Sequence, residues 1–134
     1  MYGGICGKTD TWHNDIVTIS NSYNIGEIQA ANGTATGIGI FGGYKENFII
    51  NNCYNAGMFK YSTSKDNVNS YSVCNVGTNT EIYHLDTIDA KYTTDSIEIN
   101  ADKLKSNSFA QELGEVWVKS DKGYPILKWQ QENN

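Results

Sequence analysis

The sequence predicts a mainly β protein: a right-handed parallel β-helix, or solenoid of short strands, with a helix and a β-hairpin as a C-terminal cap. The first observation is an internal repeat, because residues 18–26 (TISNSYNIG) are a near copy of residues 49–57 (IINNCYNAG). The second is that each copy follows a glycine cluster and ends in a glycine. The third is strand length, since strands of three or four residues cannot bury a core unless the copies stack.

Stacked copies would pair equivalent strands in parallel, about 4.8 Å apart, so that equivalent side chains form ladders. We expect Ile19 over Ile50 in the core, Asn21 over Asn52 as an amide ladder, and Tyr23 over Tyr54 over Tyr83 as an aromatic ladder. Strict alternation fails at a corner, so either Cys53 or Tyr54 could point inward. An antiparallel sandwich is the competing architecture, but short glycine-bounded copies at this spacing favour the solenoid.

The elements follow in order along the chain. In the first copy, the glycine cluster at 3–7 precedes a strand at 16–19, a corner at 21–24 and a strand at 25–28. In the second copy, the cluster at 37–43 precedes a strand at 48–50, a corner at 52–55 and a strand at 56–59. A degraded third copy has residues 72–77 in place of the cluster and residues 81–86 in place of the corner.

After about Thr87 the pattern changes. Residues 97–99 resemble a strand, and Asn100 is a good N-cap for a helix that Gly114 would end. An apolar stripe of Leu104, Phe109 and Leu113 is interrupted near residues 106–108. Two strands at 116–119 and 124–129 predict a hairpin with a four-residue turn. We expect one domain over 1–134, with repeat coils at 1–88 and a cap at 89–134 that covers one end of the stack.

Because the chain opens directly into repeat-like sequence at residues 2–4, we expect it to be part of a longer protein. The composition excludes several classes of function. All ten basic residues are Lys, and the net charge is −5, which argues against nucleic acid as a partner. No apolar run approaches the roughly 20 residues that span a bilayer, so we expect no membrane insertion. Cys6, Cys53 and Cys74 are odd in number and form no CxxC pair, which favours buried thiols over a disulfide framework.

The search for catalytic or metal-binding residues gives no site, and we expect no cofactor. Asp10, His13 and Asp15 lie close together in the first loop, but a solvated polar loop explains them better than a metal centre. The acids, Asp86 and Asp89 included, are too scattered for the alternating ligands of a calcium loop, although calcium binding by a loop stays open. Cys53 and His84 form the one Cys/His pair to consider, yet Cys53 aligns with Ser22, which indicates a ladder position.

Two further chemistries also lack their residues. Glu27 and Glu46 lie at unrelated positions of the two copies, so no carboxylate pair for glycoside hydrolysis is present. The glycines at 37–43 have no Lys-Ser/Thr or helix after them, so they do not predict a phosphate loop. The remaining candidates are Tyr44, Tyr61 and Tyr71, which lie in expected loops and could contact a glycan or a protein.

The two copies, residues 3–7 with 22–26 and residues 39–42 with 52–57, resemble the GLUG repeat of bacterial surface proteins. Residues 108–113, 117–118 and 123–130 are similar to the ending that often follows such repeats. The resemblance implies a secreted or wall-attached protein, often of low-GC Gram-positive bacteria. Similar repeats occur in adhesin-like proteins and in non-catalytic regions of immunoglobulin A-cleaving metallopeptidases. We therefore expect a non-catalytic stalk, spacer or adhesin-like module whose partner is a host glycan or matrix protein. The alternative is an accessory or substrate-binding domain of a secreted peptidase or glycan-active enzyme.

Overall fold

A computed structural model describes residues 2–3, 5, 16–30, 36–40, 48–74 and 78–131. The fold is mainly β, and its larger sheets are parallel, as the sequence predicts. The largest sheet has the order β10-β9-β6-β2, and β3 also pairs with β6. A second sheet has the order β1-β5-β8, and a third joins β4 to β7. Among the described strands, the antiparallel pair is the C-terminal hairpin of β11 and β12.

The chain runs through these elements in a repeating order. The bounds before the C-terminal region are β1 Tyr2–Gly3, β2 Val17–Ser20, β3 Tyr23–Asn24, β4 Ile28–Ala30, β5 Thr36–Ile38, β6 Phe48–Asn55, β7 Phe59–Tyr61, the 3₁₀ helix η1 Lys65–Asn67, β8 Asn69–Tyr71 and β9 Thr78–Leu85. The C-terminal elements are β10 Ile97–Ile99, α1 Ala101–Leu104, α2 Asn107–Leu113, β11 Trp117–Val118, β12 Ile126–Leu127 and α3 Lys128–Gln131.

Equivalent segments of the repeat lie side by side in register. We call residues 16–30, 48–61 and 78–90 the first, second and third rungs. Ile19 pairs with Ile50, and Tyr23 with Tyr54, which in turn pairs with Tyr83. The predicted core and aromatic ladders are thus confirmed. Parallel pairing continues beyond residue 88, since Tyr92 bridges Tyr71 and β10 pairs with β9.

The corner of each rung has a left-handed residue at the same place. Asn21, Asn52 and Glu81 have φ values of 51°, 53° and 53°. Such a residue interrupts the strict alternation of side chains along a strand. As a result Ile50 and Cys53, three residues apart, both lie in one apolar cluster with Ile40, Val73, Cys74 and Ile82.

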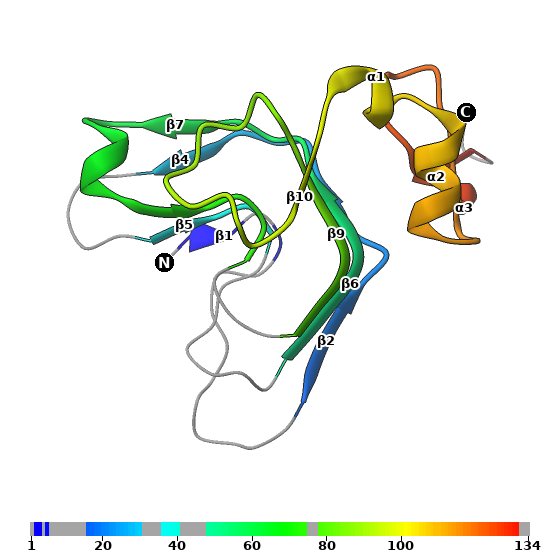
Figure 1. Cartoon of the computed structure of the whole chain (residues 1–134), viewed down its shortest axis with the longest axis horizontal. Coiled ribbons are helices and arrows are strands. Elements are labelled where there is room, and N and C mark those ends of the chain that lie inside the picture. Colours follow the sequence, from blue (N-terminus) through cyan, green and yellow to red (C-terminus); the bar gives the residue numbers. More distant parts are fainter. Residues whose placement is uncertain are drawn as a thin grey trace.

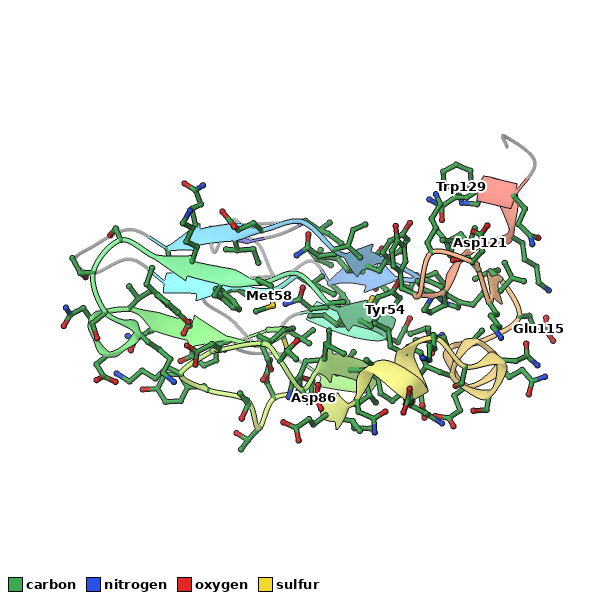
Figure 2. All side chains as sticks on the ribbon, turned by 90° about the horizontal axis from the view of Figure 1, so that it is seen from above. Tyr54, Met58, Asp86, Glu115, Asp121 and Trp129 are labelled. Carbon is green, nitrogen blue, oxygen red and sulfur yellow. The ribbon has the colours of Figure 1, made fainter. Side chains whose placement is uncertain are left out.

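The sequence left open whether Cys53 or Tyr54 points inward. Both side chains are fully buried, on opposite sides of β6. Tyr54 belongs to a different cluster from Cys53, formed with the C-terminal region. The Tyr54 ring is stacked on that of Tyr23 at 5.2 Å, and its hydroxyl donates to the Pro125 carbonyl at 2.6 Å. Figure 2 shows Tyr54 where the stacked strands meet this C-terminal region.

The C-terminal residues 89–134 were expected to cover one end of the stack, and this is correct only for the part that ends with β10, which pairs with β9 at the edge of the largest sheet. The helices and the hairpin that follow were expected at the same end, and that expectation is wrong. They pack against the outer face of the largest sheet, as Figure 1 shows. Their buried side chains meet Tyr23, Tyr54 and Tyr83, one from each rung. The reason is the tyrosine ladder, which leaves a wide aromatic surface on that face. Phe109 and Trp117 cover this surface and become almost wholly buried.

Local signals placed several elements correctly. Asn100 caps α1 by accepting from the Lys103 N–H, and Ser106 caps α2 at the predicted interruption. Gly114 ends α2 with a φ of 126°.

The bounds of other strands were predicted wrongly. The strands expected at 25–28 and 56–59 are β4 and β7, which begin three residues later. The second hairpin strand is also shorter than expected, since residues 128–131 form α3.

Candidate functional site

A ladder of polar side chains crosses all three rungs and β10 at one position. Asn24 pairs with Asn55, and Asn55 pairs with His84, which pairs with Glu98 on β10. Asn55 is fully buried and His84 is 2% exposed. Buried polar groups need partners, so this ladder is the first place to look for chemistry.

The amide part of the ladder lies at Asn24 and Asn55. Asn24 Nδ2 donates to Asn55 Oδ1 at 3.0 Å, and Asn55 Nδ2 donates to the Ser72 carbonyl at 2.8 Å. Each Asn oxygen also accepts from the backbone N–H two residues later, at Gly26 and Gly57. We predicted an amide ladder at Asn21 and Asn52, three residues earlier, where the structure instead uses Asn for its left-handed backbone.

A second cluster surrounds the Asp95 carboxylate. Its Oδ2 accepts from the backbone N–H groups of Val73 and Cys74 at 2.6 and 2.7 Å, and its Oδ1 accepts from the Ser72 hydroxyl at 2.5 Å. The Ser72 hydroxyl also lies 3.0 Å from that of Ser96. The carboxylate therefore ties the segment after β8 to the segment before β10.

His84 joins the ladder to this cluster. Its Nδ1 lies 2.8 Å from the Ser96 hydroxyl, and its Nε2 lies 3.7 Å from Glu98 Oε1. A hydroxyl, an imidazole and a carboxylate in this order also occur in hydrolytic triads. Here the imidazole is buried, and within the described residues its Nε2 has no hydrogen-bond partner. Ser96 and His84 are oriented toward one another, and the carboxylate at Nε2 is that of Glu98, beyond hydrogen-bond distance. The neighbouring Asp95 carboxylate is not part of this arrangement, because its oxygens are occupied by structural donors.

The Cys53–His84 pair is not brought together by hydrogen bonding. The Cys53 thiol donates to the Asn51 carbonyl at 3.1 Å and lies in the apolar cluster between the strands. Burial raises the pKa of the Cys53 thiol to about 11, which leaves it protonated at neutral pH. A buried, protonated thiol is a poor nucleophile, in keeping with a ladder position.

The three tyrosine candidates have different surroundings. Tyr44 lies outside the described residues. The Tyr61 hydroxyl is held by the Ser70 hydroxyl at 2.8 Å and by the Asp89 carbonyl. Burial is the main cause of the raised pKa of Tyr61, so its hydroxyl is a structural donor.

Tyr71 forms the more open aromatic site. Its ring is stacked on that of Tyr92, with centroids 4.9 Å apart, and Tyr92 is 40% exposed. The Lys91 ammonium lies 5.7 Å from the centre of the Tyr92 ring. Burial, followed by the charges of Tyr92 and Asp95, raises the pKa of Tyr71. We call Tyr71, Lys91 and Tyr92 the aromatic pair site. The sequence alone missed Tyr92, because nothing in it shows that β8 and residue 92 lie side by side.

No cluster of three or more metal-ligating side chains lies within the described part of the chain. Asp10, His13 and Asp15 are outside that part. Asp89 is paired with Lys65 at 2.7 Å. In the described residues no helix is long and apolar enough to cross a bilayer.

Comparison with known proteins found no match to a protein-family model, a curated protein or a solved structure. The likeness to GLUG repeats therefore rests on the residues quoted above and stays a prediction.

Proposed function

We propose that this chain is a non-catalytic extracellular module of a bacterium, secreted or attached to the cell wall. In this proposal its parallel sheets form a short right-handed β-solenoid that serves as a stalk, spacer or adhesin-like segment. Three features support the solenoid: the repeated rung order, the in-register parallel pairing and the left-handed residue at each corner. An experimental structure with antiparallel pairing between the rungs would contradict it.

The observation that carries the non-catalytic assignment is the use made of the buried polar groups. The Asp95 carboxylate and the Asn55 amide are committed to hydrogen bonds that tie neighbouring segments together. The Ser72 hydroxyl is buried and occupied in the same way. These contacts explain Asn55, Ser72 and Asp95 as scaffold. Among the buried polar side chains of the described residues, His84 is the one group in this network with an unpaired nitrogen, and it is the group that the following experiment tests.

A hydrolase screen tests this assignment directly. The chain is incubated with ester, peptide and glycoside reporters beside Ser96→Ala and His84→Ala variants. We expect the wild type and both variants to give the same background rate. Turnover by the wild type that disappears in Ser96→Ala, with an unchanged circular dichroism spectrum, would show that the Ser96–His84–Glu98 arrangement is catalytic.

The second candidate is an accessory or substrate-binding domain of a secreted peptidase or glycan-active enzyme. The aromatic pair site favours it, because a stacked pair of rings with one exposed member, Tyr92, beside a cation suits sugar rings and peptide side chains. Binding would be measured on glycan arrays and immobilised matrix proteins. If this site binds, Tyr92→Ala should lose at least tenfold in affinity, a loss of about 1.4 kcal/mol.

The matched control is Trp129→Ala, which removes another exposed aromatic ring, on α3. Figure 2 shows Trp129 at the upper edge of the C-terminal region, apart from the stacked strands. Equal losses in Tyr92→Ala and Trp129→Ala would indicate non-specific adhesion of aromatic side chains. An absence of binding to all glycans and matrix proteins would favour the spacer.

A further inference from the structure

The first rung forms an open edge. Among the described strands, β2, β3 and β4 each pair on one side with a strand of the second rung. Ile16 is 69% exposed and Ile25 is 46% exposed. Glu27 is the one charged residue in 16–30, whereas residues 86–99 contain five. Exposed edge strands of a sheet are normally protected by charged side chains. The first rung lacks this protection, as does an edge strand that pairs with another strand.

Gly26 gives independent support. Gly57 has the same place in the second rung, and a Cβ there would lie 2.1 Å from the Gly26 carbonyl oxygen. Gly57 is therefore required by the rung that precedes it. A Cβ at Gly26 would meet only Asn24 Oδ1, at 3.4 Å, among the described residues, and Gly26 has no positive φ. The described contacts give no reason for glycine at this position, but a rung stacked on this edge would give one.

The amide ladder points to the same side. Asn55 Oδ1 accepts two hydrogen bonds, one from the Gly57 N–H and one from Asn24 Nδ2 of the preceding rung. Asn24 Oδ1 accepts from the Gly26 N–H, at 3.2 Å, and the described residues supply no second donor. An amide oxygen has two lone pairs, so Asn24 Oδ1 retains an acceptor site for a preceding rung.

We propose that the edge formed by β2, β3 and β4 is a docking surface for one further β-rung that ends in Asn-x-Gly and pairs in parallel. Its Asn side-chain NH₂ would donate to Asn24 Oδ1, and its glycine carbonyl would lie against Gly26. The exposed end of a second copy fits poorly, because β10 covers the third rung there and Glu98 occupies the ladder position. An ionised carboxylate has no proton to donate to Asn24 Oδ1. The inference uses only register and contacts, so it stands apart from the proposed function.

The test extends the full chain at its N-terminus by a second copy of residues 36–66, which is one repeat in length and keeps the seven-residue step from the end of one rung to the strand that pairs with Gly37. Urea unfolding is followed for the parent and extended chains, each with and without Gly26→Ala. Gly26→Ala should leave the parent unchanged or slightly stabilised, because the new methyl group has room. In the extended chain it should raise the unfolding equilibrium constant tenfold or more, because the methyl group would meet the added rung.

Two controls make the result decisive. Gly57→Ala should destabilise both chains, which shows that the assay detects a blocked rung contact. In the added rung, the copy of Asn55 is the residue that would donate to Asn24 Oδ1. Replacing this one Asn by Leu should remove most of the gain in stability that the extension confers. If Gly26→Ala has the same effect in the parent and extended chains, the proposal is wrong. Sedimentation of the parent chain tests the occupant, and self-association that Gly26→Ala abolishes would identify a second copy instead.

Discussion

The strongest prediction concerns Asn55, whose side chain makes three hydrogen bonds in the interior. Asn55→Ala removes the bonds to Asn24, Ser72 and Gly57. It leaves the buried Gly57 N–H and Ser72 carbonyl without this side chain, at about 1–3 kcal/mol for each group. We expect a loss of about 3–5 kcal/mol, a large share of the 5–15 kcal/mol that is typical of a whole domain.

Asn24→Ala is the matched control. Asn24 makes the same kinds of hydrogen bond, but two of them are exposed, so water replaces them. We expect a loss of about 1 kcal/mol. Both variants would be measured by urea unfolding, with Trp fluorescence and circular dichroism as coincident probes. Losses in the two variants that agree within about 0.5 kcal/mol would refute the argument that burial of Asn55 decides the cost.

Asn55→Asp separates the acceptor and donor roles of the same side chain. A carboxylate can still accept from Gly57 and Asn24, but it cannot donate to the Ser72 carbonyl. Burial and the lost donor favour the protonated acid, so the folded pKa of the new carboxyl lies above the unfolded value of about 3.9. Relative to wild type, the variant is therefore most stable below that value and loses stability as the pH rises. Equal losses at pH 3.5 and pH 7 would contradict the donor role.

Further predictions concern the corners and the buried thiol. Asn52→Ala should cost about 1 kcal/mol because of its φ of 53°, whereas Asn52→Gly should be nearly neutral in urea unfolding. In a Tyr83→Phe background, which removes the hydroxyl that donates to Glu81, Glu81→Gly should gain about 1 kcal/mol by the same measurement. Cys53 should react with a thiol reagent far more slowly in the native protein than in urea at pH 8. Its contribution to stability should be present below pH 9 and be lost as the pH rises toward 11, and rapid native labelling would contradict its burial.

The sequence predicted the parts of the fold that depend on repetition. A 31-residue offset between two similar segments is enough to assign Tyr23 over Tyr54, because parallel pairing maps equal positions onto each other. It could not give the strand bounds after the corners. Residues 25–27 and 56–58 are apolar enough to resemble strands, yet they form the bend that the Asn side chains at 24 and 55 stabilise from within.

The position of the C-terminal region could not be read from the sequence for a different reason. The caps of α1 and α2 and the hairpin are local features, and local signals found them, whereas α3 was expected to be part of a strand. Where it docks depends on which face of β6 presents Tyr54. That face is set by the left-handed Asn52, because the interruption turns Cys53 inward and Tyr54 outward. A single backbone angle thus decides whether the tyrosine ladder fills the core or binds the C-terminal region.

The buried polar network was missed because its members are far apart in the chain and of ordinary type. The sequence does not show that the residue after β8 lies beside the residues before β10. Only this contact in the fold brings Ser72 within hydrogen-bond distance of Asp95 and Ser96. The Asn-x-Gly pattern shared by residues 24–26 and 55–57 was the available signal. It suggests an Asn side chain that bonds the backbone two residues on, with a glycine that lets the next rung approach. In the second rung, Asn55 and Gly57 contact the first rung. Asn24 and Gly26 are the same two residue types in the first rung, and among the described residues no rung contacts them on the other side. The repeat therefore carries information about a contact as well as about a fold, because Asn24 and Gly26 have the chemistry of an interior position at an exposed edge.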